Sequence, residues 1–362
     1  PRIAGLPNSA SQRAFDLLIK SNVLSSMLGG KEEGLVGATA TPIANSIAEM
    51  HVMQRFIQPN TLAELGLDEF DAWAATFGEA VTGMEIAPDG SGYRMNTRFA
   101  KFVNVAELMA IFRMRADIQT RSMLNLPTPA IAGGKPRAIA CAASDALKAF
   151  TKSLVERADK VRNRSVKPEE DNMLKITHAG RIAALDMRLV DPSLPAHPGG
   201  KLDMVCREVV RIHAETAAKR GTQLIFCDMS TPKEVGFSVY NQLRCDLIAA
   251  GIPAEQIEFI HDHDSDSAKD RLFRRVREGS VRVLMGSTSK MGVGTNVQLR
   301  LKAVHQIDSP WRPCDVEQRD GRGLRVGNMW EEIELLRYVT ESSFDSYMWQ
   351  GLEIKAAFIE QI

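Results

Sequence analysis

The stretch VEQRDGRGLRVGN, residues 316–328, places Arg319, Arg322 and Arg325 three residues apart, with glycines between them. Arginine stays charged at every working pH, and its planar guanidinium group donates to phosphate oxygens. Glycine lets a backbone approach a ligand closely and costs about 1 kcal/mol in a helix interior. An isolated R-x-x-R pattern is more typical of an exposed turn. Other features of the sequence are therefore needed to distinguish a turn from an anion site.

The bulk composition is that of a soluble globular protein without a general preference for polyanions. The chain has 362 residues, and 45 Lys and Arg balance 45 Asp and Glu, so any site for a polyanion must be local. Five scattered cysteines without a C-x-x-C pattern argue against a disulfide framework or a zinc site. With no apolar run of membrane-spanning length and no signal peptide, we expect a cytoplasmic protein without a membrane partner.

The first third of the chain is expected to contain one unit of a parallel α/β sheet and a helical insertion. Helical spacing of apolar residues predicts a helix over 9–28. A short apolar strand at 34–42 and a helix at 43–57 form a strand–turn–helix unit. From 59 to 126 the pattern is helical, interrupted at 85–95 by a turn or hairpin.

The last part of the chain alternates regularly between strands and helices, beginning after a Pro- and Gly-rich break at 191–201. Such alternation indicates a parallel sheet covered on both faces. The expected helices are 201–219, 233–250, 266–278, 315–325 and 344–361. The expected strands are 223–229, 257–261, 281–287, 303–309 and 334–340.

Polar, small-residue loops follow three of the expected strands, where ligands bind in open parallel sheets. They are GATATP (37–42), GSTSKMGVGTN (286–296) and DSPWRPCDVEQRDGR (308–322). Hydroxylated residues and glycines also build ordinary turns, so each loop alone is weak evidence. Their order, followed by the arginine stretch, is the stronger signal.

In this order the segments resemble the later motifs of superfamily 2 helicases, in particular the Swi/Snf group of DNA translocases. GATATPIANSIAEM is similar to the third motif, TQLIFCDM to the fourth, LMGSTSKMGVGTNVQ to the fifth and HQIDSPWRPCDVEQRDGRGLRVGN to the sixth. GGKLDMVCREVV resembles the start of the second lobe. The resemblance implies an α/β fold of RecA-like lobes: the distal part of lobe 1 with its insertion (1–130), a helical connection (131–199) and a complete lobe 2 (200–362).

The resemblance also implies an ATP site and a DNA track, with Mg²⁺ as the metal of the complete protein and no metal site in this chain. Arg322 and Arg325 would be arginine fingers, and Gln318 would contact nucleotide or bridge the lobes, whereas Arg319 would be an ion-pairing residue of the lobe surface. The other implied residues are Gly292 and Gly294 for ATP, Ser287, Thr288, Lys290, Asn296 and Trp311 for DNA, and Thr39 and Thr41 for coupling between nucleotide and lobe movement. For Trp311, packing against the sheet edge is an equal alternative.

The chain contains no G-x-x-x-x-G-K-[ST] and no D-E-x-H. In the family both precede the third motif, so we expect them upstream of residue 1, in cis or in another chain, and this chain to be inactive alone. Residues 70–104 are similar to phage- and plasmid-encoded proteins that join an adenine methylase to such a motor, including antirestriction proteins. This implies a bacterial host cell, or packaging in a phage particle.

Three alternatives stay open. A helicase-derived module that binds nucleic acid or a partner without catalysis would look the same in this sequence, and an unrelated nucleotide-binding α/β enzyme is the third function class. The stretch HDHDSD (261–266) would pair His261 and His263 on one face of a strand as metal ligands, although the family has a loop there.

Overall fold

The computed structural model describes residues 11–39, 41–44, 46–86, 93–119, 121–291 and 295–359. Its main feature in this part of the chain is a seven-stranded sheet in which every pairing is parallel. The order is β3-β9-β8-β5-β7-β6, and β4 also pairs with β9. The strands are β3 (Ala130–Ile131), β4 (Arg137–Cys141), β5 (Thr222–Phe226), β6 (Ile257–Phe259), β7 (Val283–Gly286), β8 (Leu301–Gln306) and β9 (Glu332–Thr340).

Two apolar cores cover the two faces of this sheet, because successive strand residues point to opposite faces. In β5, Ile225 belongs to the core under helices α9 (Lys201–Glu215) and α10 (Val239–Ala249). Its neighbours Leu224 and Phe226 belong to the core under α11 (Asp266–Glu278). The expected α/β fold with a parallel, doubly covered sheet is therefore confirmed.

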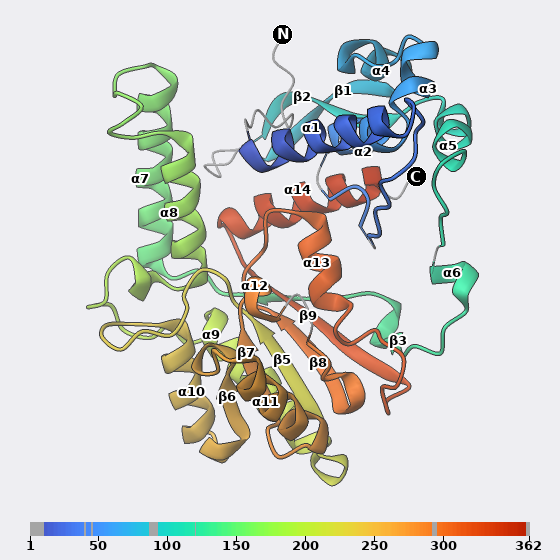
Figure 1. Ribbon diagram of the computed structural model, residues 1–362. Helices are drawn as coiled ribbons and strands as arrows, with labels where there is room; N and C mark the ends of the chain where they lie inside the picture. The colour runs from blue at the N-terminus through green and yellow to red at the C-terminus, as the bar shows by residue number, and fades with distance from the viewer. Residues whose placement is uncertain are drawn as a thin grey trace.

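A helical hairpin, α7 (Asp145–Arg162) and α8 (Met173–Leu185), rises beside the sheet (Figure 1). Near its tip the guanidinium of Arg157 donates to both carboxylate oxygens of Asp171, at 2.7 and 2.8 Å. Phe344 of α14 (Phe344–Ile359) is buried with apolar residues of both hairpin helices, including Leu154 and Ile176. The hairpin is thus joined to the end of the chain.

A separate core in the N-terminal part of the chain extends from Ile43 to Phe112 and includes the fully buried Trp73. The Trp73 Nε1–H donates to Gln54 Oε1 at 2.7 Å. The helices of this part are α1 (Gln12–Met27), α2 (Ala48–Ile57), α3 (Pro59–Glu64), α4 (Phe70–Phe77) and α5 (Val105–Arg113), followed by α6 (Arg121–Leu124). The strands β1 (Gly78–Ile86) and β2 (Tyr93–Phe102) form an antiparallel pair on either side of the expected turn, whose residues 87–92 lie outside the described part of the chain. The expected helical pattern over 59–126 is therefore wrong at 78–86 and 93–102.

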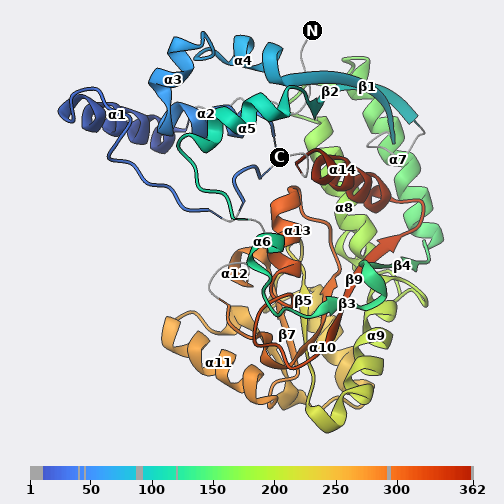
Figure 2. The same cartoon turned by 90° about the vertical axis from the view of Figure 1, so that its right-hand side faces the viewer.

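Helix α14 lies between this part and the parallel sheet in both views (Figures 1 and 2). Its Ile359 packs against the core around Trp73. Two short helices, α12 (Thr288–Met291) and α13 (Pro313–Asp320), follow β7 and β8. They occupy the carboxyl end of the sheet, the end that faces α14 in Figure 1.

Three expectations need correction. The described residues of 34–42 form no strand, because a strand needs a hydrogen-bonded neighbour and this segment has none in the described part of the chain. The parallel sheet also takes β3 and β4 from residues 130–141, so it reaches into the part expected to be a helical connection. Helix α13 ends at Asp320 rather than 325, just before the glycine-rich stretch.

None of the described helices is long and apolar enough to cross a membrane.

Candidate functional site

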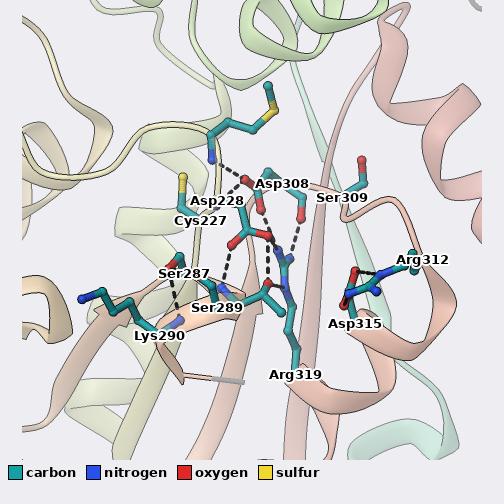
Figure 3. Close-up of polar contacts among 12 residues, drawn as sticks. Cys227, Asp228, Ser287, Ser289, Lys290, Asp308, Ser309, Arg312, Asp315 and Arg319 are labelled. Atoms are coloured by element: carbon teal, nitrogen blue, oxygen red, sulfur yellow. Dashed lines mark hydrogen bonds and ion pairs between the residues drawn. The ribbon is translucent and has the colours of Figure 1, made fainter. Parts of the chain in front are cut away.

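Four polar residues meet at the carboxyl end of the sheet. Asp228 follows β5, Thr288 opens α12 directly after β7, Asp308 follows β8, and Arg319 lies on α13. Because the carboxyl ends of parallel strands lie along one edge, residues distant in the sequence come together there. Figure 3 shows Arg319 between the two carboxylates.

Arg319 is the centre of this network, and its side chain is fully buried. The guanidinium donates to Asp228 Oδ2 at 2.8 Å and to Asp308 Oδ1 at 3.1 Å. It also donates to the Asp308 carbonyl oxygen at 2.7 Å and to Thr288 Oγ1 at 2.8 Å. The expected ion-pairing role of Arg319 therefore fits the structure, but the residue lies in the interior and not on the lobe surface.

The two carboxylates accept backbone donors as well. Asp308 Oδ2 accepts from the N–H groups of Asp228 and Met229, at 2.6 and 3.0 Å. Asp228 accepts from the N–H and the hydroxyl of Thr288, at 2.6 and 2.9 Å. Burial raises the pKa of Asp308, and Arg319 opposes that rise. The network thus fixes the loops after β5, β7 and β8 relative to α13.

Arg322 and Arg325 form a second cluster of charge just beyond α13. Both guanidinium groups donate to the same acceptor, the carbonyl oxygen of Thr295, at 3.2 and 3.1 Å. Burial and, to a smaller extent, the neighbouring charge of Arg325 together lower the pKa of Arg322 to about 10. Burial also lowers the pKa of Arg325. Two close cations that burial and mutual repulsion destabilise are a suitable environment for an anion.

In the loop after β7, several side chains that were expected to contact DNA make contacts with other groups of the protein. Ser287 is buried, and its hydroxyl lies 3.0 Å from that of Ser289. The Thr288 side chain belongs to the Arg319 network. Lys290 Nζ lies 3.5 Å from Asp264, and Asn296 is exposed while its carbonyl accepts from Arg277. Contacts of these residues with DNA stay a prediction.

Among the remaining expected residues are Gln318, Gly292, Gly294, Thr39 and Thr41. Gln318 is half-buried on α13, whereas Gly292 and Gly294 lie outside the described residues. The Thr41 N–H donates to Thr39 Oγ1 at 3.1 Å in the segment before α2. That segment descends toward α13 in both views (Figures 1 and 2).

Trp311 follows β8 and is 45% exposed. The Arg181 guanidinium of α8 lies 4.5 Å from the centroid of the Trp311 ring, and it donates to the Ser309 carbonyl oxygen at 2.7 Å. Arg181 itself is buried, and burial lowers its pKa. The ring is therefore held from one side by α8 while much of it stays accessible.

Sequence reasoning did not identify Asp228, Asp308 and Arg181 as parts of the site. A signal existed for the first two, since each is the acidic residue directly beyond an apolar strand, in FCD and IDS. Arg181 gives no such signal, because its contacts are with a loop more than a hundred residues away.

The histidines of HDHDSD do not form the pair that the alternative metal site would require. Residues 260–262 form a 3₁₀ turn instead of a strand, so the alternation of faces is lost. The His261 ring packs edge-on against Tyr240, and His263 Nε2 lies 3.3 Å from Glu258. Within the described residues, no group of three or more His, Cys, Asp or Glu side chains could hold a metal ion.

Two family models match the chain. Residues 1–120 match a probable helicase domain, and residues 200–327 match the helicase conserved C-terminal domain, which spans both charge clusters described above. In these two regions the chain is similar to helicases. Defense against restriction protein B of Escherichia phage P1 is 33% identical over 86 residues, which are 24% of this chain and 4% of that protein.

Solved helicase structures show a distant likeness. The match with the C-terminal part of the Fun30 ATPase domain covers 58% of this chain and 73% of the Fun30 chain, at 16% identity and a TM-score of 0.34. The match with S. cerevisiae Dbp5 bound to RNA and ADP BeF3 covers 46% of this chain and 38% of the Dbp5 chain, at 19% identity and a TM-score of 0.33. The match with the DUF1998 helicase MrfA bound to DNA covers 42% of this chain and 20% of the MrfA chain, at 15% identity and a TM-score of 0.31. At these scores the likeness does not extend to function.

Proposed function

We propose that this chain carries the second lobe of an ATP-driven DNA translocase of the Swi/Snf type, which acts on the DNA backbone without sequence specificity. Residues 200–362, together with the strands at 130–141, would form that lobe. Residues 11–119 would be the distal part of the first lobe. The proposal extends to a complete protein, because the chain spans only 4% of the curated relative that it matches.

The observation that carries the proposal is the pair of guanidinium groups on the Thr295 carbonyl oxygen. Phosphate oxygens placed there would accept from both guanidinium groups, because the planar donor pattern of arginine matches phosphate. ATP with Mg²⁺ would supply the phosphoryl group whose transfer drives the motor. Arg322 and Arg325 would then stabilise the charge that develops on that group, which is worth about 10³ to 10⁵ in rate for an arginine finger.

Arg319 supports these residues without touching the nucleotide in this proposal. Its bonds to Asp308 and Asp228 fix α13, and the stretch with Arg322 and Arg325 follows α13 directly. A shift of about 1 Å in a catalytic group costs on the order of 10² in rate. A buried ion-pair network is a physical means to prevent such a shift.

The relative in phage P1 is a protein of defence against restriction, and the match covers a small part of it. It supports an antirestriction context in a bacterial host as a further part of the proposal. The competing function, a helicase-derived module that binds DNA or a partner without catalysis, predicts the same fold but no role for the paired arginines in turnover.

The experiment is DNA-stimulated ATP turnover in a version of the protein that also carries a P-loop and a magnesium-binding acidic motif. Arg322→Ala and Arg325→Ala are each expected to lower kcat by about 10³ or more, with a smaller effect on KM. Arg162→Ala, on the exposed tip of the α7–α8 hairpin, is the control and should keep full turnover. Normal turnover in both test variants would favour the non-catalytic module.

A further inference from the structure

A cavity of about 180 Å³ opens beside the candidate DNA residue Trp311. Helix α14 provides most of its wall, including Tyr347, Gln350, Gly351 and Lys355, and the Trp311 ring closes it on the side of the β8–α13 loop. Since Trp311 lies in the loop between β8 and α13, the cavity lies between this loop and α14. It is separate from the cluster of Arg322 and Arg325 and shares no lining residue with it.

The loop that carries Trp311 is held on two sides. From α8, Arg181 stacks its guanidinium on the Trp311 ring at 4.5 Å and donates to the Ser309 carbonyl oxygen. From α14, Lys355 Nζ lies 3.5 Å from the Trp311 carbonyl oxygen. Trp311 is 45% exposed, so packing alone does not fix the position of its ring. The contacts with Arg181 and Lys355 hold the residue in one position before a ligand binds.

The size and lining of the cavity fit one planar heterocycle. A cavity of about 150 Å³ is sufficient to bind benzene. The aromatic rings of Trp311 and Tyr347 offer stacking surfaces, and the Gln350 amide can donate to and accept from a base edge. The Lys355 ammonium is a suitable partner for the phosphate attached to such a base.

We propose that this cavity takes a single unstacked base of a nucleic-acid strand, stacked against Trp311, and that Arg181 is the positioning residue of that ring. The inference rests on the proposed nucleic-acid function and goes beyond it, because backbone contact alone does not require a base to leave its stack. Base–aromatic stacking is tolerant of sequence, so this site is compatible with binding that reads no sequence.

Gly351 allows the cavity to be closed without disturbing the fold. A Cβ atom at this position meets nothing within 4 Å, and its backbone is not left-handed. Gly351→Leu would therefore fill space that is now open, and leucine also favours a helix over glycine. Gly351→Ala is the matched control, since it makes the same change in helix propensity but fills little of the cavity.

The test uses the 362-residue chain and a thymidine oligonucleotide carrying one 2-aminopurine, with its duplex as the second probe. Binding of the single strand is expected to quench the 2-aminopurine, because an indole stacked on it quenches its emission. Gly351→Leu and Trp311→Leu should abolish the quenching and weaken single-strand binding about 5- to 100-fold, the range for one lost base–aromatic stack. Gly351→Ala should bind both probes like the unmodified chain, and Gly351→Leu should leave binding of the duplex unchanged.

The outcomes separate the two levels of the proposal. If the oligonucleotide binds at low salt but Gly351→Leu changes neither affinity nor quenching, the base site is wrong and the translocase proposal stands. Equal losses in Gly351→Ala and Gly351→Leu, or equal losses on single strand and duplex, would also overturn the base site. No binding of either probe would contradict the nucleic-acid function itself. Thermal unfolding of each variant identifies a loss that comes from misfolding.

Arg181 has a test of its own. Arg181→Met keeps the length of the side chain but removes its charge and its bond to the Ser309 carbonyl oxygen. We expect it to reduce the quenching of 2-aminopurine while Arg181→Lys, which keeps a cation over the ring, retains part of it. A merely structural residue would change the unfolding temperature and leave the quenching of the folded protein as it is.

Discussion

The Arg319 guanidinium lies 2.8 Å from the carboxylate of Asp228, a residue 91 positions earlier in the chain. The same guanidinium bonds Asp308 and Thr288, so one side chain joins the ends of β5, β7 and β8. Removing it would leave two carboxylates close together without their shared cation. This relationship leads to the first prediction.

Arg319→Ala should lower the free energy of unfolding by about 3–5 kcal/mol, the cost of removing one partner of a buried ion pair. Denaturant unfolding measures it. Arg207→Ala is the control, because its i,i+4 pair with Asp203 is exposed and should be worth about 0.5 kcal/mol. Adding Asp308→Asn to Arg319→Ala should recover part of the loss, since it removes one of the stranded charges. Equal effects in the test and control variants would mean that the network contributes little.

His305 should make stability dependent on pH. It is fully buried between Tyr338 and Gln223, at 2.8 and 2.9 Å, and burial lowers its pKa from 6.5 to about 3. Its stabilising contribution is present above pH 6.5 and is lost as the pH falls toward 3, because only the unfolded chain binds the proton in that window. At pH 4.5 the loss is about 3 kcal/mol.

The measurement is the free energy of unfolding between pH 7 and 4, compared with His305→Asn. The asparagine variant is less stable at pH 7 but should lose less stability on acidification, since it has no proton to bind at this position. Parallel pH curves for the two proteins would contradict the assignment of a neutral, buried His305.

Binding of DNA by the chain should be independent of sequence and should weaken steeply with salt. Because 45 basic and 45 acidic residues balance, any attraction comes from a local surface and from counterion release. A site that contacts about six phosphates loses on the order of 10³ in affinity between about 50 and 200 mM salt. Fluorescence anisotropy with two unrelated duplexes measures both properties, and a strong preference for one of them at about 200 mM salt would count against backbone recognition.

The 362-residue chain alone should not hydrolyse ATP. The sequence contains neither a P-loop nor D-E-x-H, so it lacks the lysine and backbone donors that hold the phosphates and the acid that positions magnesium. Phosphate release in the presence of DNA measures this, beside a version that carries both motifs. Robust turnover by the chain alone would point to a different nucleotide site.

The sequence by itself determined the α/β class, most strands and helices of the parallel sheet and the order of the polar loops. Apolar periodicity is a local property, and it correctly placed α11 at 266–278 and the closing helix from 344 onward. The same local signal failed at 34–42, where apolar residues predicted a strand but no neighbouring strand exists in the described part of the chain.

The tertiary structure alone decided which acceptors each of the three arginines bonds. Arg319, Arg322 and Arg325 have the same spacing and chemistry in the sequence, yet Arg319 is enclosed by carboxylates while the other two share the Thr295 carbonyl oxygen. The physical reason is that the partners come from distant strands: Asp228 and Thr288 reach Arg319 only when β5 and β7 align in register, and Arg181 reaches Trp311 only when α8 packs beside the sheet.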